Sequence, residues 1–397
     1  MATTPFSRIP QPMIGMNWEP SPSNYTQIPA PLAYGDTDFA NDDFAALWNV
    51  DGNNVGRYDL KSIAAMPCNT IKMYNWSVPP PTGYWMRNHV NFLAMAAQLN
   101  LSVIVPISNY FTATAYSNRV DNPSGPPASA DLQDWITAIV TEVYQNNVPG
   151  AAIMWAIGNE YDNSPAGTYD YCEAVDIATI ASYIVAAEAS LGISSDNVLA
   201  FSSPVTTAIT PANASIPVSA PYDTLMGGCA IQALIQAFNS AIGASATSQR
   251  FIASVNTYQI GQQLLDYNTA FPAVFPGLNF FYGELGWSEA NGGEQDQASN
   301  VYNQFWTVLP LAKTGEPFYG ACCFEYSDEL WKGSPGSTET TFGLNTFAGT
   351  SQTSQEGDHS PVWGVSYPVD NFSQRLAYSY FVAAINGQPP PSAGPSD

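Results

Sequence analysis

The sequence has 397 residues, with 10 Lys or Arg against 33 Asp or Glu, a formal net charge of −23 and a pI near 4.1. This charge repels phosphate backbones and argues against nucleic-acid binding. Two His and five scattered Cys offer little for a zinc site, and the sequence has no run of about 20 apolar residues that would predict a membrane span. With 45% apolar residues the chain should fold, as two or three ordinary domains or as one large α/β barrel.

Eight short apolar runs alternate with helical patterns along the chain. The runs are rich in β-branched or aromatic side chains, as buried strands are. They lie at 12–17, 70–75, 102–107, 152–157, 197–202, 251–256, 278–284 and 318–325. Helices are predicted at 57–66, 84–99, 132–146, 172–191, 225–242, 260–270, 294–312 and 373–385.

This alternation predicts a single (β/α)8 TIM barrel over residues 1–386, with long loops after strands one, three, four and eight. The alternative is an open doubly wound sheet, which usually carries a Gly-rich phosphate turn after its first strand. Here that position has the sequence NWEPSPSNY, which favours the barrel. The Pro- and Ser-rich residues 387–397 are predicted to form a C-terminal tail.

Composition also bears on the compartment. Residues 1–12 lack the basic and apolar regions of a signal peptide, but few Lys and abundant Ser, Thr, Asn, Pro and Tyr favour export. We therefore expect an extracellular or cell-wall location. Four N-x-S/T sites begin at Asn24, Asn100, Asn213 and Asn371. Buried thiols, with one or two disulfides, are expected for Cys68, Cys172, Cys229, Cys322 and Cys323.

Two of the predicted strands end in a glutamate. The fourth gives AAIMWAIGNE, ending at Asn159 and Glu160, and the seventh gives NFFYGELGWS, which contains Glu284. In barrel enzymes the chemistry takes place at the C-terminal ends of the strands. Burying an unpaired carboxylate there costs free energy, so its presence points to a function. Two such acids suit glycoside cleavage, in which one protonates the leaving oxygen and the other attacks or positions water. The alternative for either residue is a salt-bridged structural acid.

These motifs resemble those of glycoside hydrolase clan A, whose barrels carry an Asn-Glu acid/base after strand four and a nucleophilic Glu after strand seven. More narrowly, they are similar to family 17, the endo-β-1,3-glucanases. The matching segments are IKMYN (71–75), IGNE (157–160), VTTAI (205–209), NTY (256–258), GELGWSEANGG (283–293) and FEYSDELWKG (324–333).

The sequence also departs from family 17. The family's strand-two Arg is Lys72 here, its E-T-G-W-P is Glu284-Leu-Gly-Trp-Ser, and the Asn before the loop glutamate is Asp328. The glucanosyltransferases of family 72 are similar in style, but their Cys-rich additions are absent. The resemblance therefore implies a distant relative or a sister family.

The resemblance implies a role for each residue of the predicted pair and its neighbours. Glu160 would be the general acid and later the base, with a pKa raised by a semi-apolar wall, and Glu284 would be the ionised nucleophile. Asn159 would bind the sugar 2-hydroxyl, and Tyr258 would donate a hydrogen bond to Glu284. The alternatives are a strand-end cap for Asn159 and a core aromatic for Tyr258.

Charged residues on two other strand ends complete the predicted site. Lys72 and Tyr74 would hold the pKa of the nucleophile low from strand two. Glu329, Lys332 and Glu339 correspond to the family's Glu, Lys and Glu ahead of a Phe-Gly-Leu segment. They would fix the loop after strand eight or contact sugar hydroxyls; a surface ion network is the alternative.

Aromatic side chains near the strand ends are the predicted sugar platforms, because flat rings stack on the apolar faces of pyranoses. Trp76, Trp287 and Trp331 are the candidates, and each could instead be a core residue; Tyr282 and Phe324 lie nearby in the sequence. His89, in a helical pattern, and His359, in a polar loop, are expected to be ordinary surface residues.

Together these features predict a retaining glycoside hydrolase that cleaves internal β-glycosidic bonds of a polysaccharide, with β-1,3-glucan as first choice. No G-x-S-x-G or P-loop motif is present, and we expect neither cofactor nor metal. The partner would be a polysaccharide or oligosaccharide. The alternatives are a transglycosylase with the same two carboxylates, a β-1,4-glucanase or mannanase, and a non-catalytic carbohydrate-binding barrel.

Overall fold

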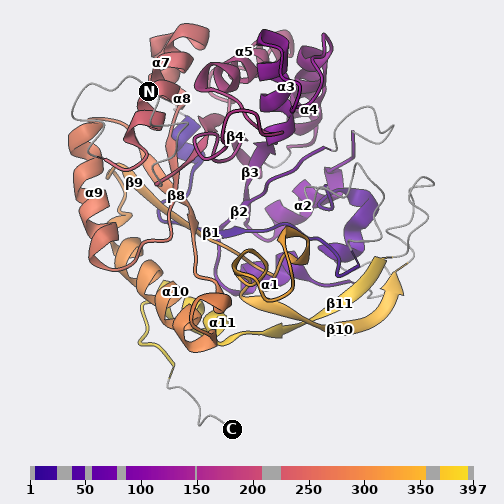
Figure 1. Ribbon diagram of the computed structural model, residues 1–397, viewed down its shortest axis with the longest axis vertical. Coiled ribbons are helices and arrows are strands. Elements are labelled where there is room, and N and C mark those ends of the chain that lie inside the picture. The colour runs from indigo at the N-terminus through magenta and orange to yellow at the C-terminus, as the bar shows by residue number, and fades with distance from the viewer. Residues whose placement is uncertain are drawn as a thin grey trace.

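A nearly closed barrel of parallel strands forms the centre of the molecule in the computed structural model, and helices surround it (Figure 1). The structure describes residues 5–24, 38–49, 56–77, 86–147, 150–207, 225–354 and 367–391. The barrel strands are β1 (Met13–Asn17), β2 (Thr70–Lys72), β3 (Ser102–Ile107), β4 (Ala152–Ile157), β5 (Ala200–Ser202), β6 (Pro204–Thr206), β7 (Ala253–Asn256), β8 (Phe280–Leu285) and β9 (Phe318–Cys323).

The predicted (β/α)8 barrel is confirmed, and the fifth of its eight strands consists of two short pieces. β5 pairs with β4 and β6 pairs with β7, all in parallel, while Ser203 lies between the pieces. Pro204, the first residue of β6, has no amide hydrogen and cannot continue the ladder, which explains the interruption. The prediction for this strand, 197–202, covered only the first piece.

Helices follow most strands, as the alternation predicted. They are α1 (Asp59–Ala65), α2 (Val90–Gln98), α3 (Asn109–Arg119), α4 (Leu132–Asn146), α5 (Ala174–Ser190), α7 (Gly228–Ile242), α8 (Ala244–Arg250), α9 (Gln262–Val274), α10 (Glu294–Val308) and α11 (Leu376–Ile385). Short 3-10 segments occupy Pro5–Arg8, Asp42–Leu47, Glu289–Asn291, Leu309–Leu311, Leu330–Lys332 and Thr338–Thr340. α3 and α8 were not predicted.

Side chains alternate between the barrel interior and the helical layer, as expected for parallel strands covered on one face by helices. On β4, Met154 belongs to an apolar cluster inside the barrel, whereas Trp155 packs outward beside Tyr144 of α4. Cys322 lies in the inner cluster and Cys323 in the outer one, so the adjacent cysteines point to opposite faces of the strand. All five cysteines are free thiols, so the expectation of disulfides was wrong.

A hairpin outside the barrel was not predicted. β10 (Asn345–Ser354) pairs in antiparallel orientation with β11 (Tyr367–Gln374), and Figure 1 shows this hairpin at the lower right, apart from the barrel strands. Because β11 runs to Gln374, the last predicted helix begins at Leu376 instead of residue 373. Among the described residues, no helix has both the length and the apolarity needed to cross a membrane.

Candidate active site

The carboxyl ends of the barrel strands surround a cavity of about 680 Å³, which is within the usual size of a ligand pocket. Glu160, after β4, and Glu284, on β8, both line it. Because the strands are parallel, side chains from segments far apart in the sequence meet at this one end. The two glutamates singled out in the sequence therefore share one cavity.

Glu284 is 3% exposed and accepts three hydrogen bonds. Lys72 Nζ is 3.1 Å and Tyr74 OH is 2.7 Å from its Oε1, and Tyr258 OH is 2.8 Å from its Oε2. Burial alone would raise the pKa of this carboxyl, but the charge of Lys72 and the Tyr74 hydrogen bond outweigh it, so the pKa lies below its usual value. Glu284 is therefore a carboxylate at neutral pH.

Glu160 has a different environment. Its φ of +51° is left-handed, which is uncommon for a residue with a Cβ, and its backbone N–H donates to the Pro204 carbonyl at 2.8 Å. Neutral amides contact its carboxyl: Asn256 Nδ2 is 2.9 Å from Oε1, and Asn163 Nδ2 is 3.1 Å from Oε2. Burial and the charge of Glu284 raise the pKa of Glu160.

The loop after β9, residues 324–344, forms one wall of the cavity and is called loop eight below. Glu329, Lys332 and Glu339 all line the cavity, with Glu339 exposed at the rim. Lys332 forms an ion pair with Glu329, which is 1% exposed, and its Nζ is 3.9 Å from Glu325 Oε2. Glu329 is therefore buried and Lys332 partly buried in the cavity wall, so this pair is not the surface ion network that was the alternative.

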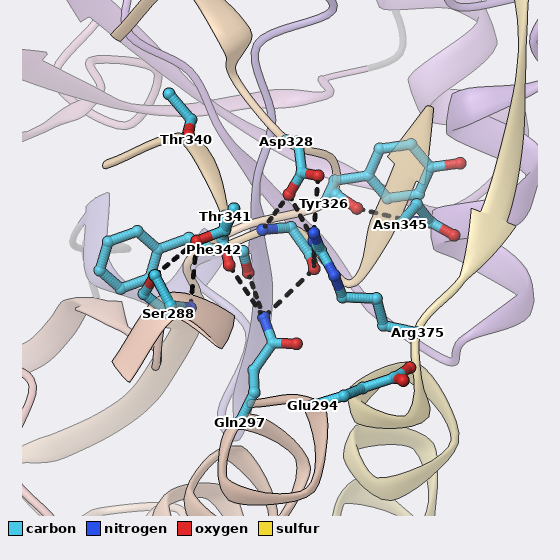
Figure 2. A network of polar contacts seen from close by, with 12 residues as sticks. Ser288, Glu294, Gln297, Tyr326, Asp328, Thr340, Thr341, Phe342, Asn345 and Arg375 are labelled. Atoms are coloured by element: carbon cyan, nitrogen blue, oxygen red, sulfur yellow. Dashed lines mark hydrogen bonds and ion pairs between the residues drawn. The ribbon is translucent and has the colours of Figure 1, made fainter. Parts of the chain in front are cut away.

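A polar network anchors loop eight to α10 and to the segment before α11 (Figure 2). Arg375 pairs with Asp328 and also donates to the Gly343 carbonyl at 2.9 Å, while the Gly343 N–H donates to Asp328 Oδ1 at 3.1 Å. Gln297 of α10 points its Nε2 at the carbonyls of residues 341–343, at 3.1 to 3.3 Å. α10 and the segment before α11 thus fix the wall of the cavity.

The aromatic predictions had mixed outcomes. Trp287 and Trp331 line the cavity, as does Phe324, whereas Tyr282 is fully buried. Trp76 does not line the cavity: it is 1% exposed, and its Nε1 donates to Glu142 Oε2 of α4 at 2.6 Å. The prediction of Trp76 as a sugar platform is corrected, because after β2 the ring turns away from the barrel mouth toward α4.

The prediction that His89 lies on the surface was also wrong. It is fully buried at the start of α2, where its ring stacks on Trp76 with centroids 3.9 Å apart. Its Nε2 is 3.2 Å from Asp38, and its Nδ1 is 3.4 Å from Glu142 Oε1. A helical pattern shows which positions are apolar, but not that an imidazole will be enclosed by two acids. His359 lies outside the described residues.

Four amide side chains of the site were missed. Besides Asn256 and Asn163, Asn109 holds the backbone of Asn159 through hydrogen bonds of 2.7 and 3.1 Å, and Asn17 Oδ1 lies 3.1 Å from the Tyr74 hydroxyl. Asn17 and Asn256 each end a strand, the same signal that revealed the two glutamates. Their role depends on contacts across the barrel, which sequence spacing does not give.

The chain matches no protein family model and no curated protein sequence. Solved structures do resemble it. The β-glycosidase BGL167 has a TM-score of 0.54 at 10% identity, with 99% of this chain and 100% of that chain covered. A GH5_18 structure from Streptomyces cattleya, in complex with GlcNAc, has a TM-score of 0.53 at 12% identity, with 95% and 80% covered. A family 39 glycoside hydrolase from the gut symbiont Bacteroides cellulosilyticus has a TM-score of 0.50 at 13% identity, with 95% and 64% covered.

The chain has the (β/α)8 barrel fold of these solved structures. At these identities the likeness extends to the fold and no further. What the cavity does must be argued from its own side chains.

Proposed function

We propose that the protein is a retaining glycoside hydrolase that cleaves internal β-glycosidic bonds, with β-1,3-glucan as its substrate. One observation carries the proposal: two carboxyl groups share a cavity, and their surroundings shift their pKa values in opposite directions. Such a pair supplies a proton donor and an anion at the same pH. Glycoside cleavage needs this combination, and retention rests on the resemblance of the two glutamates to the pair of clan A.

In the first step, the Glu284 carboxylate attacks the anomeric carbon while Glu160 gives its proton to the leaving oxygen. This breaks the glycosidic bond and forms a glycosyl-enzyme ester. In the second step, the Glu160 carboxylate takes a proton from water, which attacks the same carbon and releases Glu284. Lys72, Tyr74 and Tyr258 keep Glu284 charged and aligned, and Asn159 serves as the donor to the sugar 2-hydroxyl.

The wall of the cavity supports a neutral, polyhydroxylated substrate. Trp287 and Trp331 line the cavity and offer flat rings for stacking on the apolar faces of a sugar. The β-1,3 linkage and the internal cleavage rest on the family 17 motifs, including the loop-eight residues Glu329, Lys332 and Glu339.

Product analysis tests this proposal. The purified protein is incubated with laminarin, soluble β-1,4-glucan and β-mannan; product sizes are measured by chromatography and the first-formed anomer by NMR. We expect short laminari-oligosaccharides released as the β-anomer, and none from the Glu284→Ala variant. Products longer than the donor would identify a transglycosylase. Inactivity on all three polymers and on aryl β-glycosides would refute the proposal.

A further inference from the structure

Asn256, the last residue of β7, lies between the two proposed catalytic acids. It is 1% exposed and stands in register with Glu284 on the neighbouring strand β8. Its Nδ2 is 2.9 Å from Glu160 Oε1 and 3.2 Å from Asn159 Oδ1. The two hydrogens of one amide group can therefore serve two residues of the cavity at once.

Chemistry fixes the orientation of this amide. With Nδ2 toward Glu160, both contacts are hydrogen bonds to oxygen acceptors. With the amide turned over, Oδ1 would face Asn159 Oδ1 and the Glu160 carboxyl, and neither an amide oxygen nor an ionised carboxylate can donate to it. Asn256 Oδ1 lies against Gly283, where a built Cβ would be only 2.7 Å from it, so this position of the amide depends on the glycine.

Two consequences follow for the residues that Asn256 contacts. Both oxygens of the Glu160 carboxyl receive an amide N–H, Oε1 from Asn256 and Oε2 from Asn163. Asn163 is exposed and can turn away, whereas Asn256 is buried and held by its second contact, so its donor favours the unprotonated oxygen at Oε1 and the acidic proton at Oε2. Since Asn159 Oδ1 accepts from Asn256, its Nδ2 is the end left to donate toward the cavity that Asn159 lines.

We infer that Asn256 is a positioning residue that directs the proton of Glu160 to Oε2 and turns the amide donor of Asn159 toward the sugar. This inference rests on the proposed function. In the step concerned, the Oε2–H proton passes to the glycosidic oxygen as the bond from that oxygen to the anomeric carbon breaks and Glu284 bonds to the same carbon. Glu160 is left as a carboxylate, with Asn256 still donating to Oε1.

The decisive variant is Asn256→Asp, which has nearly the same shape but replaces the donor by an acceptor. The proton of Glu160 then lies between Oε1 and the new carboxylate, directed away from the substrate. We expect kcat/KM on the polysaccharide to fall by at least a hundredfold. Across aryl β-glycosides with phenols of different acidity, the dependence of kcat/KM on leaving-group pKa should become steeper, as it does when acid assistance is lost.

Asn256→Ala and Asn163→Ala complete the set. The alanine at 256 removes the donor without adding an acceptor, so we expect a smaller loss, about tenfold, and a smaller steepening. Thermal unfolding followed by circular dichroism shows whether each variant folds. If Asn256→Asp does not fold, Asn256→Ala still tests the inference. Asn163→Ala removes the donor to Oε2 and should keep the leaving-group dependence of the wild type.

The pH profile provides a second measurement. Glu160 is influenced by Glu284 on β8, Lys72 on β2 and the Tyr258 phenol, all of which stay in place in these variants. The alkaline limb of kcat/KM should move to higher pH in Asn256→Ala, and further in Asn256→Asp, because the charged form of Glu160 loses a donor and then gains a like charge.

An unchanged leaving-group dependence in both Asn256 variants would overturn the inference, whatever their absolute rates. So would an equal steepening in Asn163→Ala. A wild-type protein that cleaves no glycoside at all would instead refute the proposed function, so the two failures can be told apart.

Discussion

At the scale of single residues, the charge of Glu284 depends on Lys72, whose ammonium group is 3.1 Å away. Replacing Lys72 by Met keeps the chain length and removes the cation, so the pKa of Glu284 should rise. Because Glu284 acts as the anion, the acid limb of kcat/KM should move to higher pH, with the greatest loss of rate below the optimum. Kinetics from pH 3 to 8 would measure the shift; on the acid limb, kcat/KM at a fixed pH falls about tenfold for each unit by which the pKa of Glu284 rises.

The exposed Lys61, which lies over the Tyr58 ring on α1, offers a matched control. Lys61→Met changes the net charge of the protein by the same amount but should leave the acid limb in place. If both variants moved the limb equally, the effect would belong to the net charge and not to the contact with Glu284.

Glu160 should show the kinetic behaviour of an acid that becomes a base. In Glu160→Gln, we expect hydrolysis of the polysaccharide to fall by about 10²–10⁴-fold. Aryl glycosides with acidic phenols should lose far less in the first step, because they need no proton. Added azide should restore turnover by replacing activated water, giving a glycosyl azide detectable by mass spectrometry. Equal losses on both kinds of substrate, without rescue, would contradict the role.

That Glu160 and Glu284 share one cavity could be predicted, because both lie at or near the carboxyl ends of buried parallel strands. The rest of the site depends on directions that the sequence does not contain. Trp76 follows Tyr74 by two residues in the segment after β2, yet its indole turns to Glu142 in α4 while Tyr74 contacts Glu284. Asn256 was part of the NTY segment, but only the hydrogen bonds across the barrel show what it contacts.

At the scale of elements, loop eight depends on the buried pair of Arg375 and Asp328. Replacing Arg375 by Met leaves Asp328 uncompensated, so we expect the free energy of unfolding to fall by about 3–5 kcal/mol. KM should also rise, because the same loop carries Trp331 and Lys332 into the cavity. Urea denaturation and steady-state kinetics would measure the two effects.

Arg119 provides the contrast. Its side chain is 38% exposed and it pairs with the partly exposed Glu173 and the buried Asp176, which also accepts a hydrogen bond from the Glu173 backbone N–H at 2.9 Å. Arg119→Met should therefore cost less than Arg375→Met and leave KM unchanged, since water screens the arginine and Asp176 keeps its backbone donor. An Arg375 variant that behaved like the Arg119 variant would show that loop eight does not need this anchor.

The elements themselves could be predicted where their apolar pattern is strong. α4 matched its predicted range of 132–146, because five buried positions recur along one face. α3 escaped prediction because its sequence, NYFTATAYSNR, mixes polar and small residues on its buried side. The β10–β11 hairpin, rich in Ser, Thr and Gln, also lacks the long apolar runs by which the barrel strands were found.

At the scale of the whole molecule, the alternation of strands and helices predicted the barrel, but not how its outer layers are joined. His89 makes one of the contacts between these outer segments. It connects Asp38, in the segment after β1, with Glu142 of α4. Burial opposes its protonation, but these two acids raise the pKa of His89 to about 10. The imidazole is therefore a cation at neutral pH.

The linkage between this cation and folding has a definite sign. An unfolded histidine has a pKa near 6.5, so the stability that His89 contributes is complete below that pH and is lost as the pH rises toward about 10. In His89→Gln, Asp38 loses its charged partner, and we expect the free energy of unfolding at pH 6 to be about 3–5 kcal/mol lower than in the wild type. This difference should shrink steadily at pH 8 and pH 10 in urea denaturation. His359→Gln, at the only other histidine, is the matched control and should keep the wild-type dependence. A deficit in His89→Gln that stayed constant from pH 6 to 10 would mean that the imidazole acts through packing on Trp76 and not through its charge.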